Sequence, residues 1–184
     1  MSDIVHPIQF TAESQRIITA KTNDPNFDHT CWADPSLASI RKEIRNYYRQ
    51  KQKGLCSFCK NELSVSSALN CHVEHIAPKA KYPHFIFTPT NLCVICSDCN
   101  TNKRDQEVHK YSKSSIIQNK RRVKYPKSAS SFLIVHPHFD NYEEHILIVG
   151  SFYVDKGSRK GNYTIGICNL NRRLGTLGYR PFVY

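Results

Sequence analysis

Cys56-Ser-Phe-Cys59 and Cys96-Ser-Asp-Cys99 are two segments of the chain with the same Cys-x-x-Cys spacing. One such pair can be a redox motif, but two pairs present four thiolates in the tetrahedral arrangement that Zn²⁺ prefers. We therefore predict a structural zinc site with these four cysteines as ligands. A closed shell of four thiolates leaves no open position on the metal, so the ion would stabilise the fold. The other cysteines are expected to be small buried hydrophobic residues: Cys31, Cys71, Cys93 and Cys168.

The cysteines also bear on the compartment. A secreted chain would use eight cysteines for disulfides, but residues 1–7 carry neither the basic nor the apolar segment of an export signal. No run approaches the roughly 20 apolar residues that a membrane helix needs. We expect a cytoplasmic protein with reduced thiols and no membrane partner.

The composition indicates a folded, basic protein. A length of 184 residues fits a single domain with a buried core, and 40% hydrophobic residues exclude disorder throughout the chain. Twenty-six Lys and Arg against fifteen Asp and Glu give a formal net charge of +11. Such a surplus attracts polyanions, of which nucleic acid is the commonest in the cytoplasm. A charge excess that only keeps the protein soluble is the alternative.

The positive charge is concentrated between Val108 and Phe139, where no Asp or Glu occurs. We expect this region, with Arg172 and Arg173, to make sequence-independent phosphate contacts that weaken steeply with salt. The residues assigned to nucleic-acid binding are Lys79, Lys103, Lys120, Arg121, Arg122 and Lys124.

The first half of the chain predicts one long helix. Residues 1–33 are expected to be irregular, and Asp34-Pro35 supplies an N-cap and a first-turn proline. Apolar residues then recur at helical spacing until Gly54. Residues 55–109 form the zinc core, with a polar helix expected over 100–109. Aromatic residues of this half are expected in the core rather than as stacking platforms for bases: Trp32, Tyr47 and Tyr48.

The second half is predicted to contain a basic loop or arm, residues 110–131, and an antiparallel, strand-rich extension, residues 132–184. The predicted strands are 132–135, 145–149, 152–154 and 163–167, with a short helix over 169–174. Together with the zinc-stabilised core, these elements predict an α+β fold.

Reactive side chains occur between the zinc knuckles, where a purely structural zinc ribbon has no use for them. Glu74 and His75 lie in a predicted strand over residues 71–76, and Asn100 directly follows the last cysteine ligand. A neutral imidazole can take a proton from water near pH 7. A carboxylate and an amide oxygen can ligate Mg²⁺ or Mn²⁺. The combination suits metal-assisted hydrolysis of a phosphodiester.

At these residues the sequence resembles the HNH, or ββα-metal (His-Me finger), endonuclease family. The likeness covers about residues 55–104, and Glu-His and Asn occupy the signature positions. It implies a treble-clef zinc site in a ββα-metal core, His75 as general base, and Glu74 and Asn100 as ligands of a catalytic Mg²⁺ or Mn²⁺. It implies that Asn91 ties the loop and orients the base. Glu stands where Asp or His is more usual, and Asn replaces the final His.

The flanking sequence is similar, over short motifs, to defence-associated HNH proteins of Septu type, including those encoded beside retrons. The motifs include His136-Pro137, Glu143-Glu144-His145-Ile146 and Asn169-Leu170-Asn171-Arg172. The resemblance implies the nuclease effector of an anti-phage system that acts with an ABC-type ATPase. The partner is expected to dock on the C-terminal third. DNA is the expected target, and RNA or tRNA is the alternative.

Several alternatives remain open. Glu74 and His75 would point to opposite faces of a regular strand, so the pair His72 and Glu74 is a rival metal site. A zinc-stabilised module that binds nucleic acid or protein without chemistry would explain the cysteines and the charge. A thiol oxidoreductase would need a disulfide-cycling pair. The sequence assigns no role to His72, His84, His136, His138 and His145.

Overall fold

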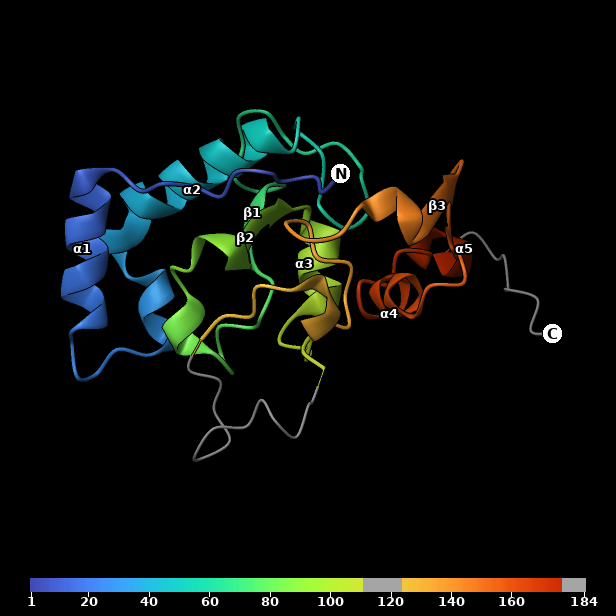
Figure 1. Ribbon diagram of the computed structural model, residues 1–184. Helices are drawn as coiled ribbons and strands as arrows, with labels where there is room; N and C mark the ends of the chain where they lie inside the picture. Colours follow the sequence, from blue (N-terminus) through green and yellow to red (C-terminus); the bar gives the residue numbers. More distant parts are fainter. Residues whose placement is uncertain (111–123, 177–184) are drawn as a thin grey trace.

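The computed structural model describes residues 1–110 and 124–176, and it shows an α+β fold with two small antiparallel sheets (Figure 1). Its α-helices and strands are α1 (Ala12–Thr22), α2 (Ala38–Lys51), β1 (His72–His75), β2 (Leu92–Ile95), α3 (Ser97–Lys103), β3 (Ile146–Val149), β4 (Phe152–Asp155), α4 (Arg159–Ile167) and α5 (Arg172–Thr176). Short 3₁₀ turns lie at His29–Ala33, Pro35–Leu37, Pro83–Phe85, Pro89–Asn91, Ala129–Ser131 and Tyr142–Glu144. Within the described residues, no helix has the length and apolar character needed to cross a bilayer.

Helix α2 confirms the predicted long helix. The Asp34 side chain accepts a hydrogen bond from Ser36 N at 2.8 Å and caps the 3₁₀ turn that leads into α2. Ile40, Ile44 and Tyr48 are fully buried at helical spacing. This apolar face packs against β1 and β2, so the helix covers one face of the central sheet.

The central sheet consists of β1 and β2, paired so that Glu74 lies opposite Cys93 and His75 opposite Leu92. All four residues of β2 are buried. The Gln52 side chain bonds both backbone groups of Val94, at 2.8 Å each, and so occupies the outer edge of β2. Helix α3 follows directly, and its N-terminus is capped by the Cys96 side chain. The order strand, strand, helix therefore brings the end of β1 next to α3.

The prediction of an irregular segment over 1–33 was wrong, because α1 lies within it. Thr11 caps this helix by accepting from Ser14 N at 3.2 Å. The helix buries only Ser14 and Ile18, and Ser14 Oγ bonds the Glu43 carboxylate on α2. A helix docked partly through polar groups lacks the apolar periodicity that sequence analysis uses.

Two predicted strands of the C-terminal extension were also wrong. Residues 132–135 form no strand and make only one isolated bridge, from Phe132 to His109. Residues 163–167 belong to α4, whose N-terminus is capped by Ser158. A Cβ at Gly161 would lie 2.2 Å from the His145 carbonyl oxygen, so a glycine permits this close approach. The hairpin β3–β4 confirms the other two strands, and the extension is therefore mixed rather than strand-rich.

Helix boundaries differ from the prediction in two further places. The polar helix expected over 100–109 is α3, which begins at Ser97 and ends at Lys103. Arg104 follows with a φ of 48° and a ψ of −130°, a positive-φ conformation in which the helix cannot continue. The short helix expected over 169–174 is α5.

Two histidines that the sequence left without a role are buried in the core. His138 Nε2 lies 2.8 Å from the Leu92 carbonyl oxygen, so the side chain joins the segment before β3 to β2. His136 Nε2 lies 2.9 Å from Tyr125 Oη. Burial lowers the pKa of both imidazoles, that of His138 to about 4, so both are neutral at pH 7.

Replacing His138 by Gln is expected to flatten the acid side of the stability curve. Because the unfolded chain binds a proton near pH 6.5 and the folded one only near pH 4, stability is complete above pH 6.5 and falls below it. One such histidine contributes about 1.4 kcal/mol per pH unit in that window. Urea unfolding of both proteins at several pH values would measure the two slopes. Equal slopes for the two proteins would contradict the prediction. Because both proteins contain the same other acid-sensitive groups, the difference between the two slopes reports His138 alone.

Candidate functional site

The four predicted zinc ligands come together in the structure. The sulfur atoms of Cys56, Cys59, Cys96 and Cys99 all lie within 4.8 Å of one another, and all four residues are buried. In the part of the chain that the structure describes, they are the only group of three or more His, Cys, Asp or Glu side chains that converges in this way.

The cluster fits a tetrahedral zinc ion. Zn–S bonds of about 2.3 Å place tetrahedral sulfur atoms about 3.8 Å apart, and the Sγ atoms of Cys59 and Cys96 are 3.6 Å apart. Backbone N–H groups support the sulfurs: Cys96 N lies 3.4 Å from Cys56 Sγ, and Cys99 N lies 3.5 Å from Cys96 Sγ. The four cysteines can therefore hold zinc, and all four protein ligands are accounted for.

The C-terminal extension packs onto the zinc cluster. Arg172 donates to Asp98 Oδ2 at 3.0 Å, and its Nη2 lies 4.0 Å from Cys96 Sγ. Tyr153 donates from its hydroxyl to the Cys59 carbonyl at 2.5 Å. Arg172, expected to contact phosphate, therefore forms an ion pair with Asp98 beside the thiol cluster.

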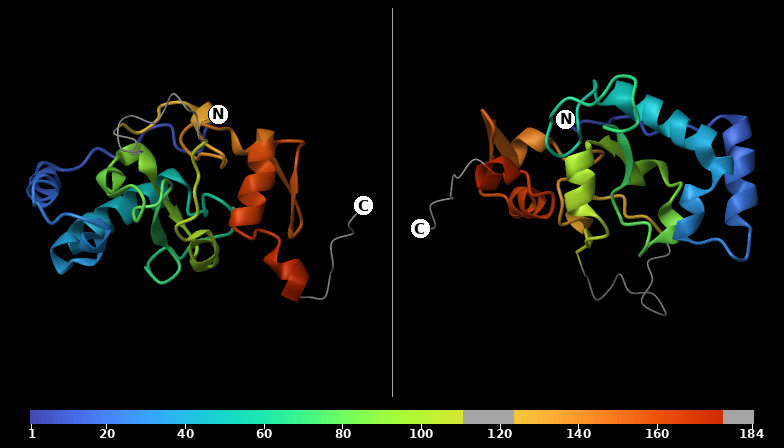
Figure 2. Two further views of the ribbon diagram at one scale, coloured as in Figure 1. Left: turned by 90° about the horizontal axis from the view of Figure 1, so that it is seen from below. Right: turned by 180° about the vertical axis from the view of Figure 1, so that it is seen from behind.

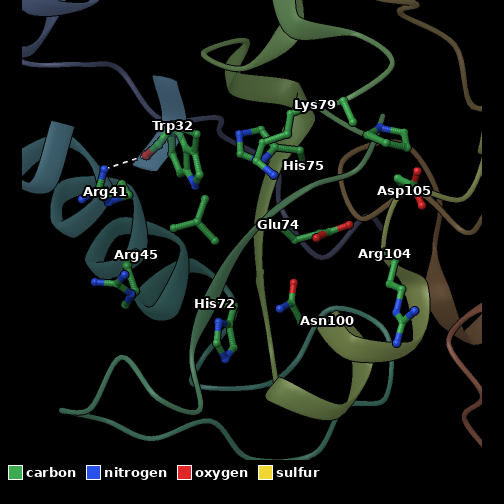
Figure 3. A pocket seen from close by; sticks show the side chains of 13 residues that line it. Trp32, Arg41, Arg45, His72, Glu74, His75, Lys79, Asn100, Arg104 and Asp105 are labelled. Carbon is green, nitrogen blue, oxygen red and sulfur yellow. Dashed lines mark hydrogen bonds between the residues drawn. The ribbon is translucent and has the colours of Figure 1, made fainter. Parts of the chain in front are cut away.

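A cleft of about 490 Å³ lies beside β1, between α2 and α3. Glu74, His75 and Asn100 all line it, and in Figure 3 the amide oxygen of Asn100 points toward the side where Glu74 lies. Glu74 and His75 both line this cleft, as do the other two residues of β1, His72 and Val73. The structure thus brings the three candidate catalytic residues together.

His75 presents a neutral nitrogen at this site. The residue is 6% exposed, and its ring packs edge-on against Trp32, with ring centres 4.6 Å apart. Burial is the main cause that lowers the pKa of His75 to about 3, and the charges of Lys79 and Lys103 contribute to the same shift. Nε2 has no hydrogen-bond partner among the described residues. A neutral imidazole whose Nε2 has no hydrogen-bond partner is able to accept a proton or bind a cation through that nitrogen in the tautomer that leaves it unprotonated.

Glu74 forms a buried ion pair with Lys103. The distance from Glu74 Oε1 to Lys103 Nζ is 2.5 Å, and the lysine side chain is fully buried. Nζ also lies 3.4 Å from the His75 carbonyl oxygen. Burial raises the pKa of Glu74, and the Lys103 charge opposes that shift. The assignment of Lys103 to a nucleic-acid surface is therefore wrong, because the side chain is enclosed between α3 and β1.

Asn91 ties the loop that follows β1. Its Oδ1 accepts from Ala77 N at 2.7 Å, and its Nδ2 donates to the carbonyls of Ala77 and Phe85 at 3.2 and 3.0 Å. The residue is fully buried and does not line the cleft. It acts by fixing the backbone just beyond His75.

The cleft also contains basic and aromatic residues that the sequence analysis did not assign to it. Arg41 and Arg45 project from α2, where they donate to the carbonyls of Trp32 and Cys71 at 2.6 and 2.9 Å. Trp32, expected in the core, lines the cleft as well (Figure 3). The i, i+4 spacing of the two arginines was the available signal, since it places them on one helix face.

The other predicted nucleic-acid contacts are placed as follows. Lys79 lines the cleft and is half-buried, and Lys124 is exposed. Lys120, Arg121 and Arg122 lie outside the described residues. His72, from the rival metal pair, also lines the cleft, but its Nε2 lies 3.0 Å from the Leu69 carbonyl.

Comparison of the chain with models of known protein families and with curated proteins gave no match.

Proposed function

We propose that the protein is a metal-dependent endonuclease that hydrolyses phosphodiester bonds of nucleic acid in the cleft beside β1. The observation that carries the proposal is the unpartnered Nε2 of a neutral His75, in a basic cleft that also contains Glu74 and Asn100. In this role His75 accepts a proton from the water that attacks the phosphorus. Arg41, Arg45 and Lys79 supply positive charge for the phosphate backbone.

Glu74 and Asn100 are the residues that would hold the catalytic cation. A carboxylate and an amide oxygen are hard donors suited to Mg²⁺ or Mn²⁺, and two protein ligands leave positions for water and phosphate oxygens. When bound, the ion would offset negative charge on the phosphate and the leaving oxygen. The Lys103 charge favours the ionised form of Glu74, and the ion pair holds the carboxylate beside the cleft.

An HNH-type core is the architecture that we propose for this site. The order β1, β2, α3 and the four-cysteine cluster support it, together with the sequence motifs given above. On the sequence motifs alone, we further propose a Septu-type or retron-associated defence nuclease that works with an ABC-type ATPase. DNA is the proposed target.

A cleavage assay with plasmid DNA and with single-stranded RNA tests the proposal. The wild type is expected to cleave with Mg²⁺ or Mn²⁺ and not in the presence of EDTA. The cleavage rate of His75→Ala is expected to be lower by a factor of about 100 or more. His72→Ala is the matched control, since it removes a histidine of the same cleft and should retain activity. Undiminished cutting by His75→Ala would remove the proposed base. Loss of activity in His72→Ala alone would favour the rival metal pair.

Binding without cutting is the outcome that would favour a non-catalytic module. In that outcome, wild-type protein with one zinc per chain would bind DNA. It would cleave neither plasmid DNA nor RNA with Mg²⁺ or with Mn²⁺. Cleavage of RNA alone would keep the proposed chemistry and change the target.

A further inference from the structure

The hairpin β3–β4 has two different edges. Gly150 and Ser151 form its two-residue turn, and the register pairs Val149 with Phe152 and Ile148 with Tyr153. In a two-residue hairpin the closing pair is hydrogen-bonded, and the pairs then alternate. The backbone N–H and C=O of Ile148 and Tyr153 therefore point outward, away from the ladder.

The outer edge of β4 is occupied, whereas that of β3 has no partner strand in the part of the chain that the structure describes. Asn171 accepts from Tyr153 N and donates to Tyr153 O, at 2.8 Å each, as a neighbouring strand would. The backbone groups of Ile148 have no such partner among the described residues. A free strand edge is a template for pairing with another extended chain.

A basic groove of about 670 Å³ runs beside this free edge. β3 contributes Ile146, Leu147 and Ile148 to its lining, and β4 contributes no residue. Four lysines also line the groove, against the carboxylates of Asp3 and Glu143, and Asp3 is already paired with Lys60. The lysines are Lys51, Lys53, Lys60 and Lys156.

One face of the same hairpin is apolar and exposed. Leu147, Val149, Phe152 and Val154 are 41–54% exposed, and the register places them together as two neighbouring cross-strand pairs. Figures 1 and 2 show the hairpin at the opposite end of the molecule from α1. An apolar cluster of this kind at the rim of a soluble protein marks an interaction surface.

We infer that the free edge of β3 is the docking site for an extended segment of a partner protein in which apolar and acidic residues alternate. Such a segment adds a third strand by bonding the Ile148 backbone. Its apolar side chains extend the exposed face of the hairpin, and its carboxylates face the groove lysines. A second copy of this chain is disfavoured because it would bring the same lysines and a further net charge of +11 to the groove. The inference does not depend on the proposed nuclease activity.

Peptide binding to the full-length protein tests the inference. The probe is a fluorescein-labelled peptide of four Val-Glu repeats, and the comparison peptide has four Val-Lys repeats. We expect the dissociation constant of the glutamate peptide to be lower than that of the lysine peptide by a factor of about ten or more. The reason is that two or more of its carboxylates pair with lysines of the groove. Ile148→Pro should weaken its binding about tenfold, since proline lacks the edge N–H while the ladder bonds belong to Leu147 and Val149. Ile148→Val is the matched control and should bind like the wild type.

Hydrogen exchange distinguishes strand addition from other modes of binding. The Ile148 amide should exchange quickly in the free protein and slowly with the glutamate peptide, whereas the Leu147 and Val149 amides should be protected in both states. Protected Leu147 and Val149 amides in Ile148→Pro would show that its hairpin is intact. If that hairpin is lost, Lys53→Glu with Lys156→Glu replaces it and should weaken binding of the glutamate peptide.

Three results of the peptide experiments would overturn the inference. They are equal binding of the two peptides, an Ile148 amide that stays unprotected in the complex, and an intact Ile148→Pro variant that binds like the wild type. Sedimentation that shows a dimer dependent on the Ile148 edge would assign the edge to a second copy and would also overturn it.

Discussion

Removal of zinc is expected to unfold the centre of the protein. Structural zinc contributes about 10–16 kcal/mol in small zinc-binding peptides, and a whole domain is stable by only about 5–15 kcal/mol. The thiol cluster joins the chain after α2 to the start of α3, and Cys96 is also the cap of that helix. Tyr153 and Arg172 attach the C-terminal extension to the same knuckles, so its packing should be lost together with the core.

Cys96→Ser and an excess of a strong chelator are the two ways to test this. Thermal unfolding followed by circular dichroism should lose its cooperative transition in both cases, and metal analysis should fall from one zinc per chain to none. Cys168→Ala is the matched control, because Cys168 is a fully buried cysteine outside the cluster. It should keep its zinc and melt cooperatively. An unchanged transition after complete metal removal would show that the cluster does not hold the fold together.

Replacing Lys103 by Met is expected to destabilise the protein by about 3–5 kcal/mol, because it leaves the buried Glu74 carboxylate without its cation. The lysine side chain is fully buried and that of Glu74 is 9% exposed, so water cannot replace the lost partner. Lys42→Met is the matched control on exposed α2 surface and should cost less than about 0.5 kcal/mol.

A double-mutant cycle separates the ion pair from the packing around it. Glu74→Gln with Lys103→Met removes both charges, and its cost should be well below the sum of the two single changes. Urea unfolding at pH 7 with zinc present measures all four proteins. Additive costs would mean that the two charges do not interact, and a loss below about 1 kcal/mol for Lys103→Met would contradict a tight buried pair.

The local sequence predicted the elements in which chemistry and periodicity are local. Two Cys-x-x-Cys knuckles identified the metal cluster, because each pair reaches one ion without help from distant residues. The apolar spacing of Ile40, Ile44 and Tyr48 predicted α2, and runs of strand-forming residues predicted the two strands of the β3–β4 hairpin. Each of these signals depends only on residues that are close to one another in the sequence.

The same local rules failed where packing overrode propensity. The run Tyr163–Ile167 is rich in strand-forming residues, yet α4 forms there because Ser158 caps it and Gly161 fits against the His145 carbonyl. Helix α1 was missed because its contact with α2 is partly polar.

The sequence by itself determined which side chains this protein has for binding zinc and for acid–base chemistry, and it placed Glu74, His75 and Asn100 near the cysteines. The tertiary structure decided that Lys103 is the buried partner of Glu74 and that Arg172 lies beside the thiol cluster. It also decided that Arg41 and Arg45 line the cleft. The physical reason is that burial and electrostatic partnership depend on distances between segments remote in sequence. Residue spacing along the chain does not contain those distances.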